Sequence, residues 1–250
     1  MPTSSTLPPL GRPLPSHVHV TPSLETPAPR VAPLKVLVVG ASGGSGRATI
    51  EALLDAGHQV TAYARHGAAL QGWGPRVQVV EGDVLVPEQV DRAVQGHDAV
   101  IITLGIRESA LRVRLFGAAR TAMNVRSLGT RHVVAAMLRH GVRRLVVQTS
   151  FGVGETRDRL PRLYRLMFQL LLKPQVADTE RQEREVRDSG LDWVIAQPVN
   201  LVDVRDEGLP CASARGEVQG MQVSRRQVGR FLAHAVGSSD YLGRSVALSA

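Results

Sequence analysis

The stretch KVLVVGASGGSGRATIEALLDAGHQVTAYAR, residues 35–65, places four glycines in seven consecutive positions between two apolar runs. The first run, residues 36–39, is continuously apolar, which is typical of a strand buried on both faces of a parallel sheet. Apolar residues then recur at helical spacing from residue 50 to 54, and Gly57 is placed to end that helix. Residues 59–64 form the second run. The pattern predicts a strand, a glycine turn, a helix and a second strand.

Strand and helix patterns continue to alternate along the chain. Further strands are expected at residues 76–84, 98–105, 143–150, 191–198 and 244–248, and helices at residues 86–96, 120–140, 176–190 and 226–236. Such alternation predicts an α/β fold with a doubly wound parallel sheet and right-handed crossovers. With 250 residues, the chain has room for one well-buried domain of this kind.

The N-terminal segment has a different composition, because residues 1–34 hold nine of the fifteen prolines. Proline breaks helices and cannot donate to a strand ladder, so we expect a disordered, proline-rich extension. The segment also lacks the continuous apolar core of a secretory signal. The folded domain is therefore expected to cover residues 35–250.

The overall composition excludes several classes of protein. No run approaches the ~20 apolar residues of a membrane span, so no membrane association is expected. Cys211 is the only cysteine, which excludes an internal disulfide and a cysteine-based metal site, and no metal is expected. We interpret it as a loop cysteine and the protein as cytoplasmic.

The charge balance is strongly basic, with a net charge of +8, but aromatic residues make up only 4% of the chain. A basic surface attracts anionic ligands, whereas single-stranded nucleic acid also requires aromatic stacking platforms. The arginines are spread along helical segments, and we interpret them as a solvated basic surface with no nucleic-acid partner: Arg112, Arg114, Arg120, Arg126, Arg131 and Arg139.

The glycine turn between strand and helix is typical of a dinucleotide-binding loop. Gly40 would allow the tight turn, Gly43 the approach of a pyrophosphate, and Gly46 the close packing of helix on strand. The N–H groups at the start of the helix would then attract the diphosphate. The loop residues expected to bind the cofactor are Gly40, Ser42, Gly43, Gly44, Ser45 and Gly46. A flexible turn without a ligand is the weaker alternative.

The spacing of this loop is G-x-x-G-x-x-G, and several further blocks accompany it: VQVVEGDV (77–84), DAVIITLG (98–105), GTRHVVAAMLRHGVRRLVVQTS (129–150), SGLDWVIAQP (189–198) and VSRRQVGRFL (223–232). With them the chain resembles the atypical short-chain dehydrogenase/reductases of the NAD(P)H-binding type, near the NmrA-like proteins and the flavin reductase/biliverdin-IXβ reductase group. The resemblance covers residues 35–250. It implies a single Rossmann-like domain with a substrate cleft over the carboxyl ends of the strands.

The end of the second strand discriminates between the two nicotinamide cofactors. NAD enzymes place an acid there for the ribose 2′-hydroxyl, whereas this chain has Arg65, nineteen residues beyond Gly46. A guanidinium can bind a 2′-phosphate through charge-assisted hydrogen bonds, so NADP(H) is the expected cofactor. The alternative is an ordinary surface arginine at a strand end.

The resemblance also implies further cofactor contacts. Asp83 and Val84 would lie beside the adenine, and Leu104 and Gly105 under the ribose and diphosphate; each could equally be an ordinary turn residue. The expected set is completed by two residues at the ends of later strands, Thr149 and Pro198.

The chain lacks the Tyr-x-x-x-Lys pair with which typical relatives donate a proton, because no lysine lies four residues after Tyr63, Tyr164 or Tyr241. Thr179 stands where many atypical relatives have a lysine. Candidate catalytic residues are Ser150, at the end of a strand, and Asn200, two residues after the proline that the biliverdin-IXβ group follows with a histidine. The alternative for Ser150 is a bond to loop backbone.

Two functions fit these residues. In the first, the protein is an NADP(H)-dependent oxidoreductase that passes hydride to a flavin, a quinone or a similar small acceptor, which needs little help with its proton. In the second, it is a non-catalytic NADP(H)-sensing regulator of the NmrA-like type. We favour the enzyme. The sequence leaves the identity of the acceptor and the oligomeric state open.

Overall fold

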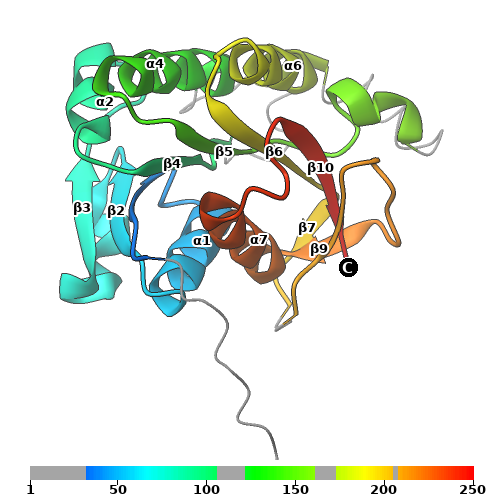
Figure 1. The fold of residues 1–250 in the computed structure, drawn as a ribbon, viewed down its shortest axis with the longest axis horizontal. Coiled ribbons are helices and arrows are strands. Elements are labelled where there is room, and N and C mark those ends of the chain that lie inside the picture. The colour runs from blue at the N-terminus through cyan, green and yellow to red at the C-terminus, as the bar shows by residue number, and fades with distance from the viewer. Residues whose placement is uncertain (1–31, 106–121, 161–172, 205–207) are drawn as a thin grey trace, which may run out of the picture. The chain divides into compact units, whose positions relative to one another are not determined.

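This computed structural model describes residues 32–105, 122–160, 173–204 and 208–250. An eight-stranded sheet lies at the centre of these residues (Figure 1). The strand order is β3-β2-β1-β4-β5-β6-β10-β8. The strands are β1 (Lys35–Val39), β2 (Gln59–Ala64), β3 (Val77–Glu81), β4 (Ala99–Ile102), β5 (Arg144–Gln148), β6 (Asp192–Pro198), β8 (Cys211–Ser213) and β10 (Arg244–Ser249). Every neighbouring pair is parallel except β10–β8. The Rossmann-like, doubly wound fold is thereby confirmed.

Helices cover both faces of the sheet (Figure 1). One face carries α1 (Gly44–Asp55) and α7 (Arg225–Gly237), and the other carries α2 (Pro87–Val94), α4 (Val125–His140) and α6 (Lys173–Arg187). In β1, Val36 and Val38 pack on the first side and Leu37 and Val39 on the second, and none of the four is more than 1% exposed. Burial on both faces is the reason that this strand is continuously apolar.

The end of the sheet differs from the sequence-based expectation. The interpretation of Cys211 as a loop residue was wrong, because it begins β8, which pairs antiparallel with β10. As a result β10 lies inside the sheet, between β6 and β8. A second, two-stranded parallel sheet, β7 (Asn200–Val202) with β9 (Gln222–Ser224), was also not predicted.

Short 3₁₀ helices occupy two connections, η1 (Gly67–Arg76) and η2 (Gly154–Arg159). Residues Ala32–Ala250 belong to one unit of the fold. The expected extension lies outside the described residues except at its last three positions, so the domain start at residue 35 stays a prediction. Tyr164 and residues 112, 114 and 120 also lie outside the described ranges.

The strand order reverses direction between β1 and β4, which are neighbours in the sheet although β2 and β3 follow β1 in the chain. In doubly wound sheets, ligands bind outside the carboxyl ends of the strands at such a switch point. The glycine turn follows β1 directly, so the fold places it at this position.

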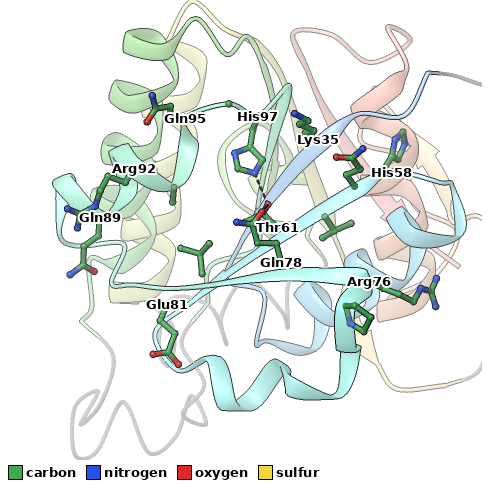
Figure 2. Close-up of a pocket in the computed structure, with 16 residues that line it drawn as sticks. Lys35, His58, Thr61, Arg76, Gln78, Glu81, Gln89, Arg92, Gln95 and His97 are labelled. Carbon is green, nitrogen blue, oxygen red and sulfur yellow. Dashed lines mark hydrogen bonds between the residues drawn. The ribbon is translucent and has the colours of Figure 1, made fainter.

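Two histidines on the amino-terminal side of the sheet are partly buried, and burial disfavours their protonated form. His58 Nδ1 accepts a hydrogen bond from the backbone N–H of Leu34 at 3.1 Å. His97 Nε2 lies 2.8 Å from Thr61 Oγ1 (Figure 2). Its Nδ1 lies 3.3 Å from the carbonyl of Val94. Burial lowers the pKa of both imidazoles below the usual 6.5.

The free energy of unfolding should therefore decrease as the pH falls from 7.5 to 5.5. With both pKa values lowered in the folded state, the unfolded chain takes up protons first, below about pH 6.5, and folding loses stability there. Urea titrations at both pH values measure the change. In His97→Gln the free energy of unfolding should differ less between the two pH values. An unchanged difference would contradict a contribution of His97 to the pH dependence.

Candidate functional site

A cleft of about 650 Å³ opens at the carboxyl ends of β1, β2, β4 and β5. It brings together most of the residues proposed from the sequence: Gly40, Ser42, Gly43, Gly44, Ser45, Arg65, Asp83, Val84, Leu104, Gly105, Thr149 and Ser150. Gly46 is buried below the loop. Pro198 and Asn200 do not line this cleft, but they line a neighbouring cavity of about 30 Å³ that Ser150 also borders.

The glycine loop is shaped by two close approaches of backbone to backbone. Gly40 has φ of +87°, and a Cβ there would lie 2.8 Å from the carbonyl oxygen of Thr103. A Cβ on Gly46 would lie 2.5 Å from the carbonyl oxygen of Gly40. Only glycine fits these positions, so the start of α1 packs directly against the turn that leaves β1.

The start of α1 suits an anion. Gly43 precedes the helix, no side chain caps it, and the first turn contains no acidic residue. The first N–H groups of a helix have no partner within it, and they carry the positive end of the helix dipole. Because Gly43, Gly44 and Ser45 line the cleft, this end of the helix faces it. The geometry fits the diphosphate of a dinucleotide.

Arg65 and Asp83 converge on the same end of the cleft from neighbouring strands. Arg65 follows β2 and is exposed, and Gly67 just beyond it donates its N–H to Glu81 Oε1 at 2.5 Å. Asp83 Oδ1 accepts from the N–H of Leu85 at 3.0 Å, which is a turn contact. The two side chains lie where adjacent parallel strands end, so a ligand in the cleft can meet both.

A buried carboxylate lies behind Thr149. Glu183 of α6 is fully buried and accepts from Thr149 Oγ1 at 2.8 Å, from Gln197 Nε2 at 2.8 Å and from Arg187 Nη2 at 3.0 Å. A buried charge costs free energy unless it is paired and hydrogen-bonded, and here both oxygens have partners. The Thr149 hydroxyl hydrogen is therefore directed away from a ligand, and the network fixes the ends of β5 and β6.

Ser150 lies where the main cleft meets the smaller cavity, because it borders both. Its hydroxyl lies 3.3 Å from the carbonyl oxygen of Phe151, the kind of backbone bond that the sequence left open as an alternative. Asn200 is exposed and belongs to β7, with its N–H donated to the carbonyl of Met221 at 3.2 Å. The catalytic roles of Ser150 and Asn200 stay predictions.

The interpretation of Arg126 as a solvated surface residue was wrong. It lines the cleft, and burial lowers the pKa of its guanidinium, an effect that the charge of Asp178 partly offsets. Arg131 and Arg139 on the same helix are exposed, as expected. Helical spacing alone could have placed Arg126 at the start of α4, but not in its half-buried position in the cleft wall.

Arg225 is another cleft residue that was missed from the sequence. It opens α7 and packs on the glycine loop, since a Cβ on Gly44 would lie 2.7 Å from its Cδ. Its Nη1 pairs with Asp203 Oδ1 at 2.7 Å. The SRRQ motif does predict the capping box that starts α7, in which Ser224 and Gln227 exchange hydrogen bonds. The contact with Gly44 joins residues far apart in the chain and leaves no local signal.

Three cleft residues have a buried polar atom without a hydrogen-bond partner among the residues described: Tyr63 Oη, Arg126 Nη1 and Gln148 Oε1. Burial, and then the charge of Asp83, raise the pKa of Tyr63 to about 12, so its hydroxyl stays protonated at neutral pH. Unpaired buried groups cost free energy, and all three side chains line the cleft. A polar ligand would supply the missing partners where its binding shifts these side chains.

A second hollow, of about 720 Å³, lies beside the beginnings of β1 and β2 and along β3 (Figure 2). Its polar groups include His97 and Thr61, which bond to each other. None of the residues proposed for the site lines it. The first cleft is therefore the candidate site.

The described residues offer neither a metal site nor a membrane-spanning helix. Within the described ranges, no group of three His, Cys, Asp or Glu side chains could hold a metal ion. None of the helices in those ranges is long and apolar enough to cross a membrane.

Comparison with known proteins gives a family. The profile of a family described as NAD(P)H-binding matches residues 40–239. A 2-alkyl-3-oxoalkanoate reductase from Stenotrophomonas maltophilia is 34% identical over 121 residues, which are 48% of this chain and 34% of that protein. A (4-alkanoyl-5-oxo-2,5-dihydrofuran-3-yl)methyl phosphate reductase from Streptomyces griseus is 27% identical over 226 residues, 86% of this chain and 67% of that protein. The chain thus spans about a third to two thirds of the length of these relatives.

A solved structure agrees with the fold. A Rossmann-fold NAD(P)-binding family protein from Shigella flexneri has a TM-score of 0.63 at 25% identity, and the match covers 86% of this chain and 92% of that chain. The resemblance drawn from the sequence motifs is confirmed.

Two alanine variants of the glycine loop should separate packing from ligand approach. In Gly46→Ala the methyl group meets the Gly40 carbonyl, so the free energy of unfolding should fall by ~1–3 kcal/mol. In Gly43→Ala the nearest atom is 3.4 Å away, so stability should change by less than ~1 kcal/mol while dinucleotide affinity falls at least ~10-fold. Urea denaturation and calorimetric titration measure both. Equal stability losses in the two variants would contradict this division.

Proposed function

Because the chain belongs to the NAD(P)H-binding family, we propose that it is an NADP(H)-dependent reductase that passes hydride to a small acceptor such as a flavin or a quinone. The observation that carries the proposal is the shared lining of one cleft. The uncapped start of α1, Arg65 and Ser150 all border it. Such a cleft can hold an extended dinucleotide with its reactive end beside a second ligand.

The preference for NADP(H) rests on Arg65. Its guanidinium is exposed at the end of β2, where a 2′-phosphate would lie, and no acid follows that strand before residue 81. The carboxylate of Glu81 already accepts from the N–H of Gly67. A cation at this position suits a phosphate rather than a bare ribose hydroxyl.

The reaction proposed is the reduction of an acceptor by NADPH and one proton, which gives NADP⁺ and the acceptor with two more hydrogens. The cofactor supplies the hydride when bound. The chain's own residues hold the two reactants together: the glycine loop binds the diphosphate, and Ser150 orients the acceptor. A flavin or quinone can take its proton from water, so this route needs no Tyr-x-x-x-Lys pair.

The relatives support a small organic acceptor. Their names describe reductases of an alkanoate and of a phosphate ester. Both names describe a substrate with an acidic group, a carboxylate or a phosphate, and we extend that property to the acceptor of this chain.

A second candidate function is a non-catalytic NADP(H) sensor. It is favoured by the hydroxyls near the reactive end of the cleft, because Thr149 donates to Glu183 and Ser150 lies close to a backbone carbonyl. Neither is prepared as a proton donor. In a sensor, occupancy of the cleft would bias the contact with a partner rather than lead to turnover.

Replacing Arg65 tests the cofactor preference. Arg65→Ala should weaken NADPH binding by ~2 kcal/mol, about 30-fold, and leave NADH binding nearly unchanged. Calorimetric titration of both cofactors measures this, with the exposed Arg76→Ala as a control for net charge. Equal losses for the two cofactors would mean that Arg65 supports the loop instead. A parent protein that prefers NADH would refute the NADP(H) proposal.

Ser150→Ala separates the two functions. If the hydroxyl orients an acceptor, turnover should fall ~10-fold or more while NADPH affinity stays the same. The measurement is NADPH oxidation with a panel of flavins, quinones and aldehydes. An unchanged rate with every active acceptor removes Ser150 from the site. Tight NADPH binding without turnover by the parent protein favours the sensor.

A further inference from the structure

Arg126 is the second residue of α4 and borders the cleft beside Gly105, where a Cβ would lie 3.9 Å from its Nη2. Its Nη1 is buried and has no hydrogen-bond partner in the described part of the chain. Arginine stays protonated in proteins, even where burial lowers its pKa as it does here. Arg126 thus brings a half-buried cation to the wall of the cleft, with its Nη1 shielded from solvent.

The described acid whose charge acts on this cation is already engaged. Asp178 of α6 accepts from the backbone N–H of Arg126 at 3.1 Å and from that of Ser127 at 3.3 Å. Its Oδ1 also accepts from Ser127 Oγ at 2.5 Å. The carboxylate therefore caps the start of α4, and its charge only partly offsets the desolvation of the guanidinium. A half-buried cation in this state would be stabilised by an anionic group of a bound ligand.

The anionic groups of the cofactor have other partners in the proposed arrangement. The diphosphate would lie at the start of α1, where Arg225 packs on Gly44, and the 2′-phosphate at Arg65. Arg126 lies beside Gly105, next to the expected path of the ribose and diphosphate. It also neighbours α6 through Asp178, and the same helix holds Thr149, which precedes Ser150, through Glu183. Arg126 and Ser150 both line the cleft, so a ligand beside Ser150 can contact both.

We propose that Arg126 binds an oxyanion, a carboxylate or a phosphate, on the acceptor, and so selects anionic acceptors over neutral ones. The inference rests on the proposed function for the identity of the second ligand. Charge-assisted hydrogen bonds from the guanidinium to an oxyanion would offset the desolvation of this half-buried cation. Arg126 acts by binding and orienting, and takes no part in the transfer of hydride.

Matched acceptors test this. Riboflavin and FMN share one isoalloxazine and differ by a phosphate, and 1,4-naphthoquinone and its 2-carboxylate differ by a carboxylate. The parent protein, loaded with NADP⁺, should bind the anionic member of at least one pair ~10-fold more tightly. Flavin fluorescence and calorimetry measure affinity without turnover, and NADPH oxidation measures kcat/KM where turnover occurs.

In Arg126→Met the preference should disappear, with the affinity of the neutral acceptor and of NADP⁺ unchanged, and Arg126→Lys should restore part of it. Arg131→Met is the matched control, because Arg131 is an exposed arginine of the same helix that pairs with Glu185. It removes one charge from the protein and should leave the preference intact.

Three results would overturn the inference. A parent protein with no preference for either anionic acceptor, or with no binding of any of the four, excludes an oxyanion site for acceptors. A loss of NADP⁺ affinity in Arg126→Met, with the acceptor preference intact, assigns the residue to the cofactor. Equal losses for neutral and anionic acceptors, with a lower melting temperature, make it a structural partner of Asp178. Turnover without any preference refutes the inference but still supports the proposed reductase. Preferential binding of an anionic acceptor without turnover supports the inference and contradicts the proposed reductase.

Discussion

The backbone of Gly40 connects the three strands and the helix around the cleft. Its N–H donates to the carbonyl of Tyr63 in β2 at 3.1 Å, and its carbonyl accepts from Gly43 N at 3.0 Å and from Thr103 Oγ1 at 3.3 Å. A Cβ at Gly46 would collide with the same carbonyl. A side chain at Gly40 would separate β1 from the end of β4, and with it the loop from the rest of the cleft. The position of the glycine loop therefore depends on a single residue, Gly40.

The opposite wall of the cleft depends on polar contacts between two helices. From α6, Asp178 reaches the start of α4, Gln182 Nε2 donates to Thr130 Oγ1 at 3.0 Å, and Glu183 reaches Thr149. All three α6 side chains are buried. Polar groups in a low-dielectric interior specify register strongly, since a shift of one helix would leave each of them unpaired. One helix thereby sets the position of both Thr149 and Arg126.

The sequence was most informative where structure is decided over short distances. The run from β1 through the glycine turn to α1 is encoded in the 21 residues Lys35–Asp55. Parallel strands bring their carboxyl ends together, so the presence of Arg65 and Asp83 in one cleft was predictable. Three-residue strands such as β8 carry too few residues for a period, and their partners lie far away in the chain. The partial burial of Arg126 was also unpredictable, because a charged residue in a helical pattern does not reveal which distant residues pack over it.

The place of β10 inside the sheet bears on the order in which the protein assembles. Arg244–Ser249 lie between β6 and β8 and contribute fully buried side chains such as Val246 and Leu248 to the core. During synthesis, β6 lacks its neighbour β10 until these residues leave the ribosome. The edge of β6 that later pairs with β10 is open to pairing with other chains in that interval. The nucleotide-binding half, β1 to β4, faces no such delay, so the two halves of one domain differ in when they become resistant to aggregation.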